Sequence, residues 1–415
     1  MTSPLTNPSF RWYLLSLSLT LLASELTTLA VSWRLFELTR DPLALGLIGL
    51  AAMVPFLSSV LYAGHLADVA DRRWIAALAL TGLIASTALL AGLDYCGQLA
   101  ARPWTAYAAV AAASLARGFL VPARGALMAD LVTTDQREAA ARVRATVFQF
   151  TSVGAKAGGG FIYAAGVALG WGSGATFVLA AVLLVVAALA MLAVVSRPQV
   201  RPEAPAPVLR SLAEGMRFLG GNRILLGAML LDLLAVLFGD AIALAPVFAD
   251  QILHLGPDGL GLLRAAPAVG ALAMSLLLAR LPPFTCAGPL LLWSVAGFGL
   301  TMIGFALATH PVLAFTCLAL SGALDFINVT VRSALVQVLT PPAMLGRVTA
   351  MQQIFIWSSN ELGAFESGLA AHLLGVVPSV IFGGLMTLGV TGAIAWTIPE
   401  LRRLGRISDL PAARN

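Results

Sequence analysis

The stretch Gly64-His65-Leu66-Ala67-Asp68-Val69-Ala70-Asp71-Arg72-Arg73-Trp74 is a short polar interruption between two long apolar runs. Apolar segments long enough to cross a bilayer flank it, so its charges are expected at one membrane surface. Gly64 allows a neighbouring helix to approach closely, and Asp68 can pair with an arginine or a helix N-terminus. Arg72 and Arg73 hold the turn on the cytoplasmic side. The simpler alternative is an ordinary loop whose charges only set the topology.

The composition restricts the protein to one broad class. Of its 415 residues, 59% are hydrophobic and 11% are charged, whereas soluble domains have about 25% charged residues. So few charges cannot cover a water-soluble domain, which indicates an integral membrane protein. The net charge of +5 comes from residues spread over loops, and this pattern argues against nucleic-acid binding. The first apolar run contains Glu25 and has no obvious cleavage site, so we expect an uncleaved first span.

Reactive side chains are few and scattered. Cys96, Cys286 and Cys317 are widely spaced, and the four histidines are equally dispersed, which predicts neither a disulfide framework nor a metal site. The sequence has no nucleophile elbow and no phosphate-binding loop. We therefore expect no enzyme activity, no cofactor and no ATP-driven transport.

Twelve segments are long and apolar enough to be transmembrane helices. They are residues 11–37, 43–66, 74–96, 104–129, 139–168, 173–195, 223–249, 258–281, 288–309, 312–338, 345–371 and 375–398. Arginines gather in the loops on the side of both termini, which predicts that both termini are cytoplasmic. The fold class is therefore an all-α membrane protein of two six-helix bundles, residues 1–195 and 223–398. A cytoplasmic linker with a short amphipathic helix, 196–222, joins the bundles, and a cytoplasmic tail, 399–415, follows them.

The two halves are related by an internal repeat. Three pairs of matching positions follow in the same order at nearly constant offsets of 212, 208 and 205 residues: Gly49 with Gly261, Arg124 with Arg332, and Arg142 with Arg347. Such a repeat is typical of transporters built from two pseudo-symmetric bundles. The second half lacks the polar stretch of residues 64–74.

Six ionisable residues fall near the middle of the predicted spans. They are Glu25, Arg117, Lys156, Asp240, Asp325 and Glu361. Each costs at least about 2.5 to 3.5 kcal/mol at the bilayer centre, so each is a candidate for proton coupling or substrate binding. The repeat places Arg117 opposite Asp325 and Lys156 opposite Glu361, so corresponding positions carry opposite charges.

Two interpretations of these charges stay open. Lys156 is the only lysine in the chain and can lose its proton, unlike an arginine, so it is either a coupling residue or part of a fixed ion pair. The four acids are likewise either proton carriers or structural partners.

Polar residues beside these charges extend the candidate site. Asn328 and Arg332 share a helix face with Asp325, and Asn360 lies next to Glu361. Such faces would line a watery cavity. Three further charges, at Asp232, Arg124 and Arg264, are expected nearer the membrane surfaces, as snorkelling side chains or gate pairs.

Five stretches together resemble the branch of the major facilitator superfamily that contains enterobactin and macrolide exporters. They are residues 37–46, 64–74, 211–219, 259–267 and 340–347. The resemblance implies alternating access between two bundles, and commonly proton-coupled export of a small amphipathic molecule. It also implies a cytoplasmic gate motif formed by Gly64, Asp68, Asp71, Arg72 and Arg73, with Asp68 and Arg72 bracing the start of helix 11. Arg117-Gly118 matches only part of the antiporters' arginine motif, and residues 154–160 lack the proline of their glycine-proline signature.

The sequence thus favours a secondary transporter of the bacterial inner membrane. We expect it to be a monomer in the lipid bilayer whose partners are a small molecule, such as a siderophore, drug or metabolite, and protons. Two alternatives remain. One is a uniporter or importer of an ionic solute, and the other is a membrane scaffold or sensor that transports nothing.

Overall fold

The computed structural model describes residues 4–171, 173–195, 208–282 and 284–406, and the part it describes is helical without strands. The first half contains η1 (Pro4–Thr6), α1 (Pro8–Thr39), α2 (Pro42–Val69), α3 (Arg72–Tyr95), α4 (Gln98–Ala101), α5 (Trp104–Leu131), η2 (Thr134–Gln136), α6 (Arg137–Ala168) and α7 (Gly174–Leu192). The second half contains α8 (Val208–Gly221), α9 (Arg223–Gly239), η3 (Ile242–Leu244), α10 (Ala245–Val247), η4 (Phe248–Ile252), α11 (Gly256–Leu278), α12 (Ala287–Ala306), α13 (Pro311–Leu339), α14 (Pro342–Leu374), α15 (Val376–Thr397) and α16 (Pro399–Arg402).

Most of the long helices are apolar enough to cross a membrane. Ten such spans occur in the described part of the chain. The helices α6 and α14 are as long, at 32 and 33 residues, but they carry several charges. The all-α membrane fold is therefore confirmed. The count of twelve spans includes α6 and α14 and stays a prediction.

The chain forms two compact units. Unit 1 comprises Met1–Arg40, Ala51–Val208 and Gly256–Ala265, and unit 2 comprises Asp41–Leu50, Leu209–Leu255 and Ala266–Asn415. Each unit thus contains the first turns of one helix whose remainder belongs to the other unit. These helices are α2 and α11.

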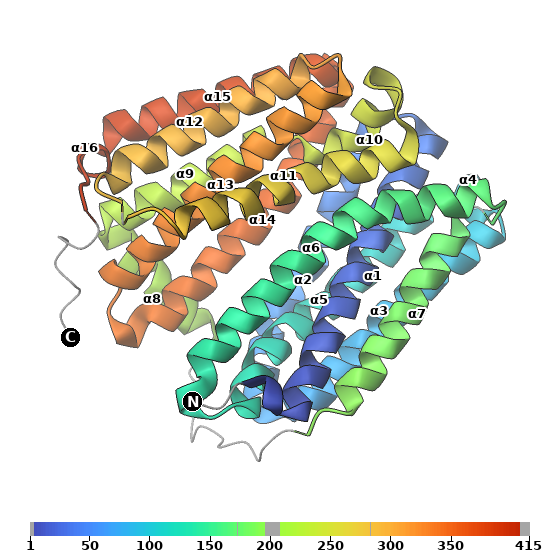
Figure 1. Cartoon of the computed structure of the whole chain (residues 1–415), viewed down its shortest axis with the longest axis horizontal. Helices are drawn as coiled ribbons and strands as arrows, with labels where there is room; N and C mark the ends of the chain where they lie inside the picture. The colour runs from blue at the N-terminus through green and yellow to red at the C-terminus, as the bar shows by residue number, and fades with distance from the viewer. Residues whose placement is uncertain (1–3, 172, 196–207, 283, 407–415) are drawn as a thin grey trace. The chain divides into compact units, whose positions relative to one another are not determined.

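Each unit has its own apolar core. In unit 1, α3 packs against both α5 and α7, and α1 packs against α6 and α7 (Figure 1). Leu80, Leu127 and Met191 are fully or almost fully buried there. In unit 2, α12 packs against α13 and α15, and α9 packs against α14 and α15, around Leu291 and Val331. Burial of such side chains, together with close helix packing, holds each unit together.

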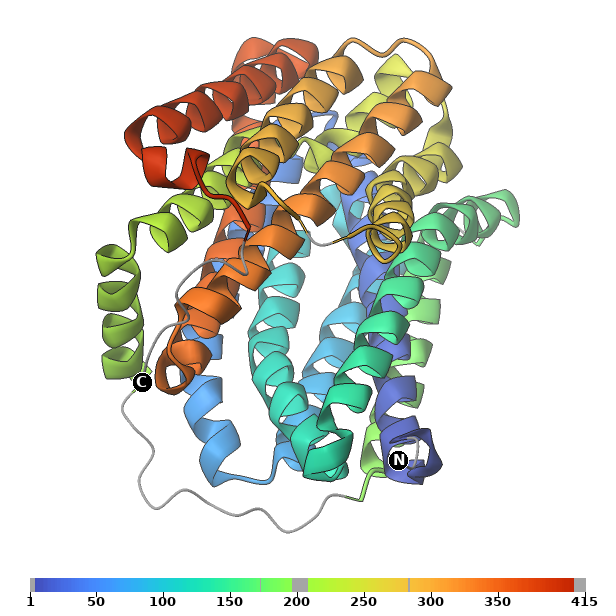
Figure 2. The same ribbon diagram turned by 60° about the vertical axis from the view of Figure 1, so that its left-hand side comes forward.

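The short helix α8 is offset from α9, to which Asn222 joins it (Figure 2). It docks on α14, because Glu214 pairs with Arg347 at 2.6 Å and Leu219 is buried in the core of unit 2. The helix includes residues 211–219, where the sequence predicts a short amphipathic segment. Residues 196–207 of the expected linker lie outside the described residues.

The seventh predicted span is interrupted. The sequence predicts one helix over 223–249, but α9 ends at Gly239 and the backbone of Asp240 is extended, with φ −83° and ψ 100°. The Oδ1 atom of Asp240 accepts a hydrogen bond from the backbone N of Ile242 at 3.0 Å. Short 3₁₀, α and π turns follow. Such breaks occur at binding sites inside membrane transporters.

Candidate functional site

A charged cluster lies inside unit 2, between α9 and α13. Arg332 Nη1 lies 2.6 Å from Asp232 Oδ2, and Asn328 Nδ2 donates to Asp232 Oδ1 at 2.6 Å. Both members of the ion pair are almost completely buried, with side chains 2% and 4% exposed. Of the two roles expected for Asp232, a snorkelling side chain or a member of an ion pair, the structure shows the ion pair, and the depth of Asp232 in the membrane stays a prediction. Its partners are about 100 residues away in the sequence. Their ion pair and hydrogen bond offset the free-energy cost of burying the carboxylate in the protein interior.

Asp325 lies one turn before Asn328 on the same helix. It is within electrostatic reach of Asp232, Arg332 and Asp240, and it interacts with the Asn328 side chain. Asp325 therefore lies within reach of two other carboxyl groups and one guanidinium. The carboxylates repel one another in the low-dielectric interior, and Arg332 attracts them.

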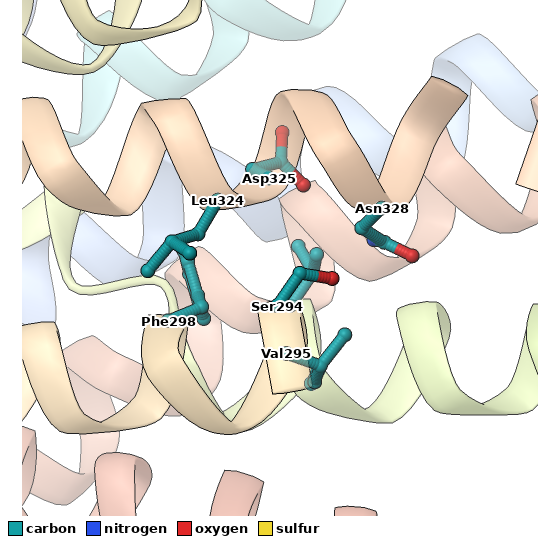
Figure 3. Close-up of a pocket in the computed structure, with 8 residues that line it drawn as sticks. Ser294, Val295, Phe298, Leu324, Asp325 and Asn328 are labelled. Carbon is teal, nitrogen blue, oxygen red and sulfur yellow. The ribbon is translucent and has the colours of Figure 1, made fainter. Parts of the chain in front are cut away.

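A cavity of about 10 Å³ adjoins Asp325 and Asn328. Figure 3 shows Asp325 and Asn328 on α13 and Ser294 and Phe298 on the neighbouring α12, with Leu324 beside Phe298; all five residues line this cavity. The Oδ1 atom of Asn328 is buried and has no hydrogen-bond partner within the described chain. The volume suits one water molecule at most, which would connect the polar groups along this face.

The break in the seventh span is tied to α14. Ser367 Oγ donates to the backbone oxygen of Asp240 at 3.1 Å, which uses an acceptor freed by the end of α9. Glu361 lies partly buried on the same helix, whereas Asn360 is exposed and donates to the backbone of Ile356 at 2.7 Å. The structure thus brings Asp325, Asn328 and Arg332 together, with Asp240 nearby. The hydrogen bond of Asn360 stays within α14, and its part in a binding site stays a prediction.

The predicted charges of unit 1 are arranged differently. Glu25, Arg117 and Lys156 are partly buried, and the described residues offer none of them an ion pair or hydrogen bond. Their roles stay predictions. Arg124, expected to snorkel, is only 6% exposed, and its Nη2 atom donates to Thr20 Oγ1 at 2.6 Å. Snorkelling is wrong for Arg124, because α1 covers it.

The polar stretch at residues 64–74 connects helices of unit 1. Asp71 Oδ1 caps α3 by accepting from the backbone N of Arg73 at 2.9 Å, and Arg72 pairs with Asp130 of α5 at 2.9 Å. Arg73 Nη2 donates to the backbone oxygen of Leu192 at 2.5 Å. The surroundings of Gly64 and the side chain of Asp68 are not among what the structure describes, so the predicted gate motif is described only in part.

A second network of unit 1 was missed from the sequence. Arg34 Nε lies 3.0 Å from Asp94 Oδ1, and Ser173 donates to the other oxygen of Asp94. This network links α1, α3 and the start of α7. Arg34 and Asp94 both lie near the ends of predicted spans. Charged residues are common there, so the sequence does not mark these two as candidates for a site.

The arrangement of two helical units with buried charges agrees with comparisons to known proteins. The family model described as transmembrane secretion effector matches residues 1–411. The chain belongs to this family of major facilitator superfamily transporters. It is therefore a multi-pass membrane transporter and not an enzyme.

The curated relatives match this chain over about half of their own length. The enterobactin exporter EntS of Escherichia coli O1:K1 / APEC is 31% identical over 197 residues, which are 47% of this chain and 47% of the relative. EntS of Shigella boydii serotype 18 (strain CDC 3083-94 / BS512) matches to the same extent.

Solved structures share the fold of this transporter over nearly the whole chain. A bacterial homologue of the human lysosomal transporter Spinster has a TM-score of 0.71 at 14% identity, covering 97% of this chain and 99% of the other. A D-xylose–proton symporter has a TM-score of 0.72 at 14% identity, covering 95% and 99%. At this identity the likeness concerns the fold alone.

Proposed function

We propose that this transporter exports a small amphipathic molecule in exchange for protons, by alternating access. The observation that carries the proposal is the surroundings of Asp325 in unit 2, which is partly buried within electrostatic reach of Asp232 and Asp240, while the nearby Arg332 is already paired with Asp232. Asp232 is held in a fixed pair with Arg332, so Asp325 is the acid best placed to gain and lose a proton.

The proposed cycle uses that proton to exclude the substrate. A proton arriving from outside the cell neutralises Asp325, which changes the charge of the cluster and favours release of the substrate. Loss of the proton towards the cytoplasm restores the carboxylate. The cavity between Asp325, Asn328 and Ser294 would hold the water through which the proton moves.

Export is supported by the sequence relatives, which are enterobactin exporters. We therefore propose a siderophore, drug or secondary metabolite as the substrate and the bacterial inner membrane as the location, with both termini in the cytoplasm. A monomer is sufficient for this cycle.

The proposal is tested with inverted membrane vesicles that contain the purified protein. Uptake of enterobactin, or of any compound that raises the unfolding temperature of the protein, is measured with an imposed pH gradient. We expect uptake to stop when nigericin collapses the gradient. Asp325→Asn should abolish gradient-driven uptake, whereas Asp258→Asn, which changes an exposed acid, should not. Uptake that is indifferent to the gradient and to Asp325→Asn would refute proton coupling.

A further inference from the structure

Arg124 and Arg332 occupy matching places in the two units. Each lies on the corresponding helix of the repeat, α5 or α13, and each reaches the first helix of its own half. Arg332 contacts Asp232 of α9, and Arg124 contacts Thr20 of α1. Thr20 and Asp232 are 212 positions apart, which is the offset that also relates Gly49 to Gly261. Unit 2 therefore has a carboxylate where unit 1 has a hydroxyl.

Arg124 is a buried cation that has no carboxylate partner among the residues that the structure describes. Its Nη2 atom donates hydrogen bonds to Ser16 O at 3.2 Å, Ser16 Oγ at 3.1 Å and Thr20 Oγ1 at 2.6 Å. Its Nε atom is buried and has no partner in the described part of the chain. The hydroxyl and carbonyl dipoles orient the guanidinium, but they do not neutralise its charge.

A second guanidinium lies next to the first. Arg144 of α6 interacts with the Tyr13 hydroxyl and is within electrostatic reach of Arg124. The Nε atom of Arg144 is also buried without a partner among the described residues. Tyr13 in turn donates to the backbone oxygen of Arg124 at 3.3 Å. Two cations and three hydroxyl groups thus converge from α1, α5 and α6.

This set of groups is complementary to an oxyanion. Two neighbouring guanidiniums repel each other, and burial of a charge without a counter-ion is unfavourable. A carboxylate, sulfonate or phosphate would accept hydrogen bonds from both guanidiniums. We propose that Tyr13, Ser16, Thr20, Arg124 and Arg144 bind the oxyanion group of the transported molecule. The link to a transported molecule rests on the proposed function, but binding of an anion does not.

The comparison with unit 2 provides a direct test. Thr20→Asp would place a carboxylate beside Arg124, as Asp232 lies beside Arg332, and would compete with a bound anion. Thr20→Asn has nearly the same size and no charge, so it is the matched control. The purified full-length variants are titrated with potassium phosphate and with sodium 2-naphthalenesulfonate at constant ionic strength, and the unfolding temperature is recorded.

Three results are expected. Both anions raise the unfolding temperature of the wild type and of Thr20→Asn, as a ligand of the native state does. Thr20→Asp weakens the affinity for both anions at least about tenfold. Without anions, Thr20→Asp unfolds at a higher temperature than Thr20→Asn, because the carboxylate compensates Arg124.

The results that overturn the site are equally specific. No stabilisation of the wild type by either anion would refute it, whatever the variants do. A Thr20→Asp protein that binds both anions as tightly as Thr20→Asn would also refute it. Tighter binding of naphthalenesulfonate than of phosphate supports an amphipathic substrate, and the reverse order refutes that assignment. None of these measurements involves transport, so loss of the proton-coupled cycle in vesicles would be recognised separately.

Discussion

The ion pair between Asp232 and Arg332 allows a prediction at the scale of single residues. Asp232→Asn leaves a guanidinium that is 2% exposed without its counter-ion. Removing one partner of a buried pair destabilises a protein by about 3 to 5 kcal/mol. We expect a lower unfolding temperature in detergent. The double variant Asp232→Asn with Arg332→Gln should recover much of the loss. If Asp232→Asn is as stable as the wild type, the pair does not hold α9 against α13.

Single residues also show what the sequence can and cannot predict. The spacing of Asp325, Asn328 and Arg332 places them on one helix face, and in the structure Asn328 interacts with Asp325 and shares Asp232 with Arg332. The partners of Asp232 and the burial of Arg124 beneath α1 could not be predicted, because hydropathy describes one span at a time and not the contacts between spans.

At the scale of helices, Asp240 caps the segment that follows the break of α9. Asp240→Ala removes the acceptor for the backbone N of Ile242 and should destabilise the protein by about 0.5 to 2 kcal/mol. Asparagine is an equally good cap, so Asp240→Asn should retain stability. Chemical unfolding in mixed micelles distinguishes the two. Equal losses in both variants would mean that the carboxylate charge matters more than the cap.

In unit 2, the first turns of α2 pack against α14 backbone to backbone. A Cβ atom added at Gly368 of α14 would lie 2.6 Å from the Cα atom of Gly46 in α2, with no flexible side chain to yield. Gly368→Ala should therefore separate these helices and cost about 1 to 3 kcal/mol. Gly389→Ala is the control, because nothing lies within 4 Å of its added Cβ. The shift in unfolding temperature is the measurement, and equal shifts would contradict this packing.

Helices were easier to predict than their interruptions. Apolar length identifies the spans, and the high hydropathy of Arg223–Ile252 predicts one continuous helix. The helix ends instead at Gly239. A Cβ atom at Gly239 would lie 2.5 Å from Thr387 Oγ1, so glycine lets α9 pack closely on α15, and this contact is invisible to a hydropathy average.

At the scale of the whole molecule, each compact unit needs a segment from the other half of the sequence. Unit 1 includes Gly256–Ala265, and unit 2 includes Asp41–Leu50. We expect residues 1–207 and 208–415, produced as separate chains in one cell, to copurify. Each half alone should be degraded faster, since its contacts are incomplete. Copurification on a tag carried by one half measures the association. Two halves that are stable when separate would contradict this expectation.

The repeat made the division into two similar halves predictable, because Gly49, Arg124 and Arg142 have counterparts at nearly constant offsets. The exchange of short segments between the units was not predictable. It depends on close approaches such as that of Gly160 to Gly261, where an added Cβ would lie 2.6 Å from a Cα atom. A glycine that allows such contact has the same hydropathy as one that faces lipid.

The interruption after Gly239 has a consequence for the exchange of backbone amide hydrogens with deuterium. Between residues 240 and 253 the backbone changes from an extended residue through 3₁₀ and α turns to a π turn, so its amide groups have poorer hydrogen-bond partners than those of a regular helix. Deuterium should enter these amides well before those of α9. These amides lie next to the acids of unit 2. Their rate of deuterium uptake would therefore report on each step of a transport cycle at this site, without any change to the protein.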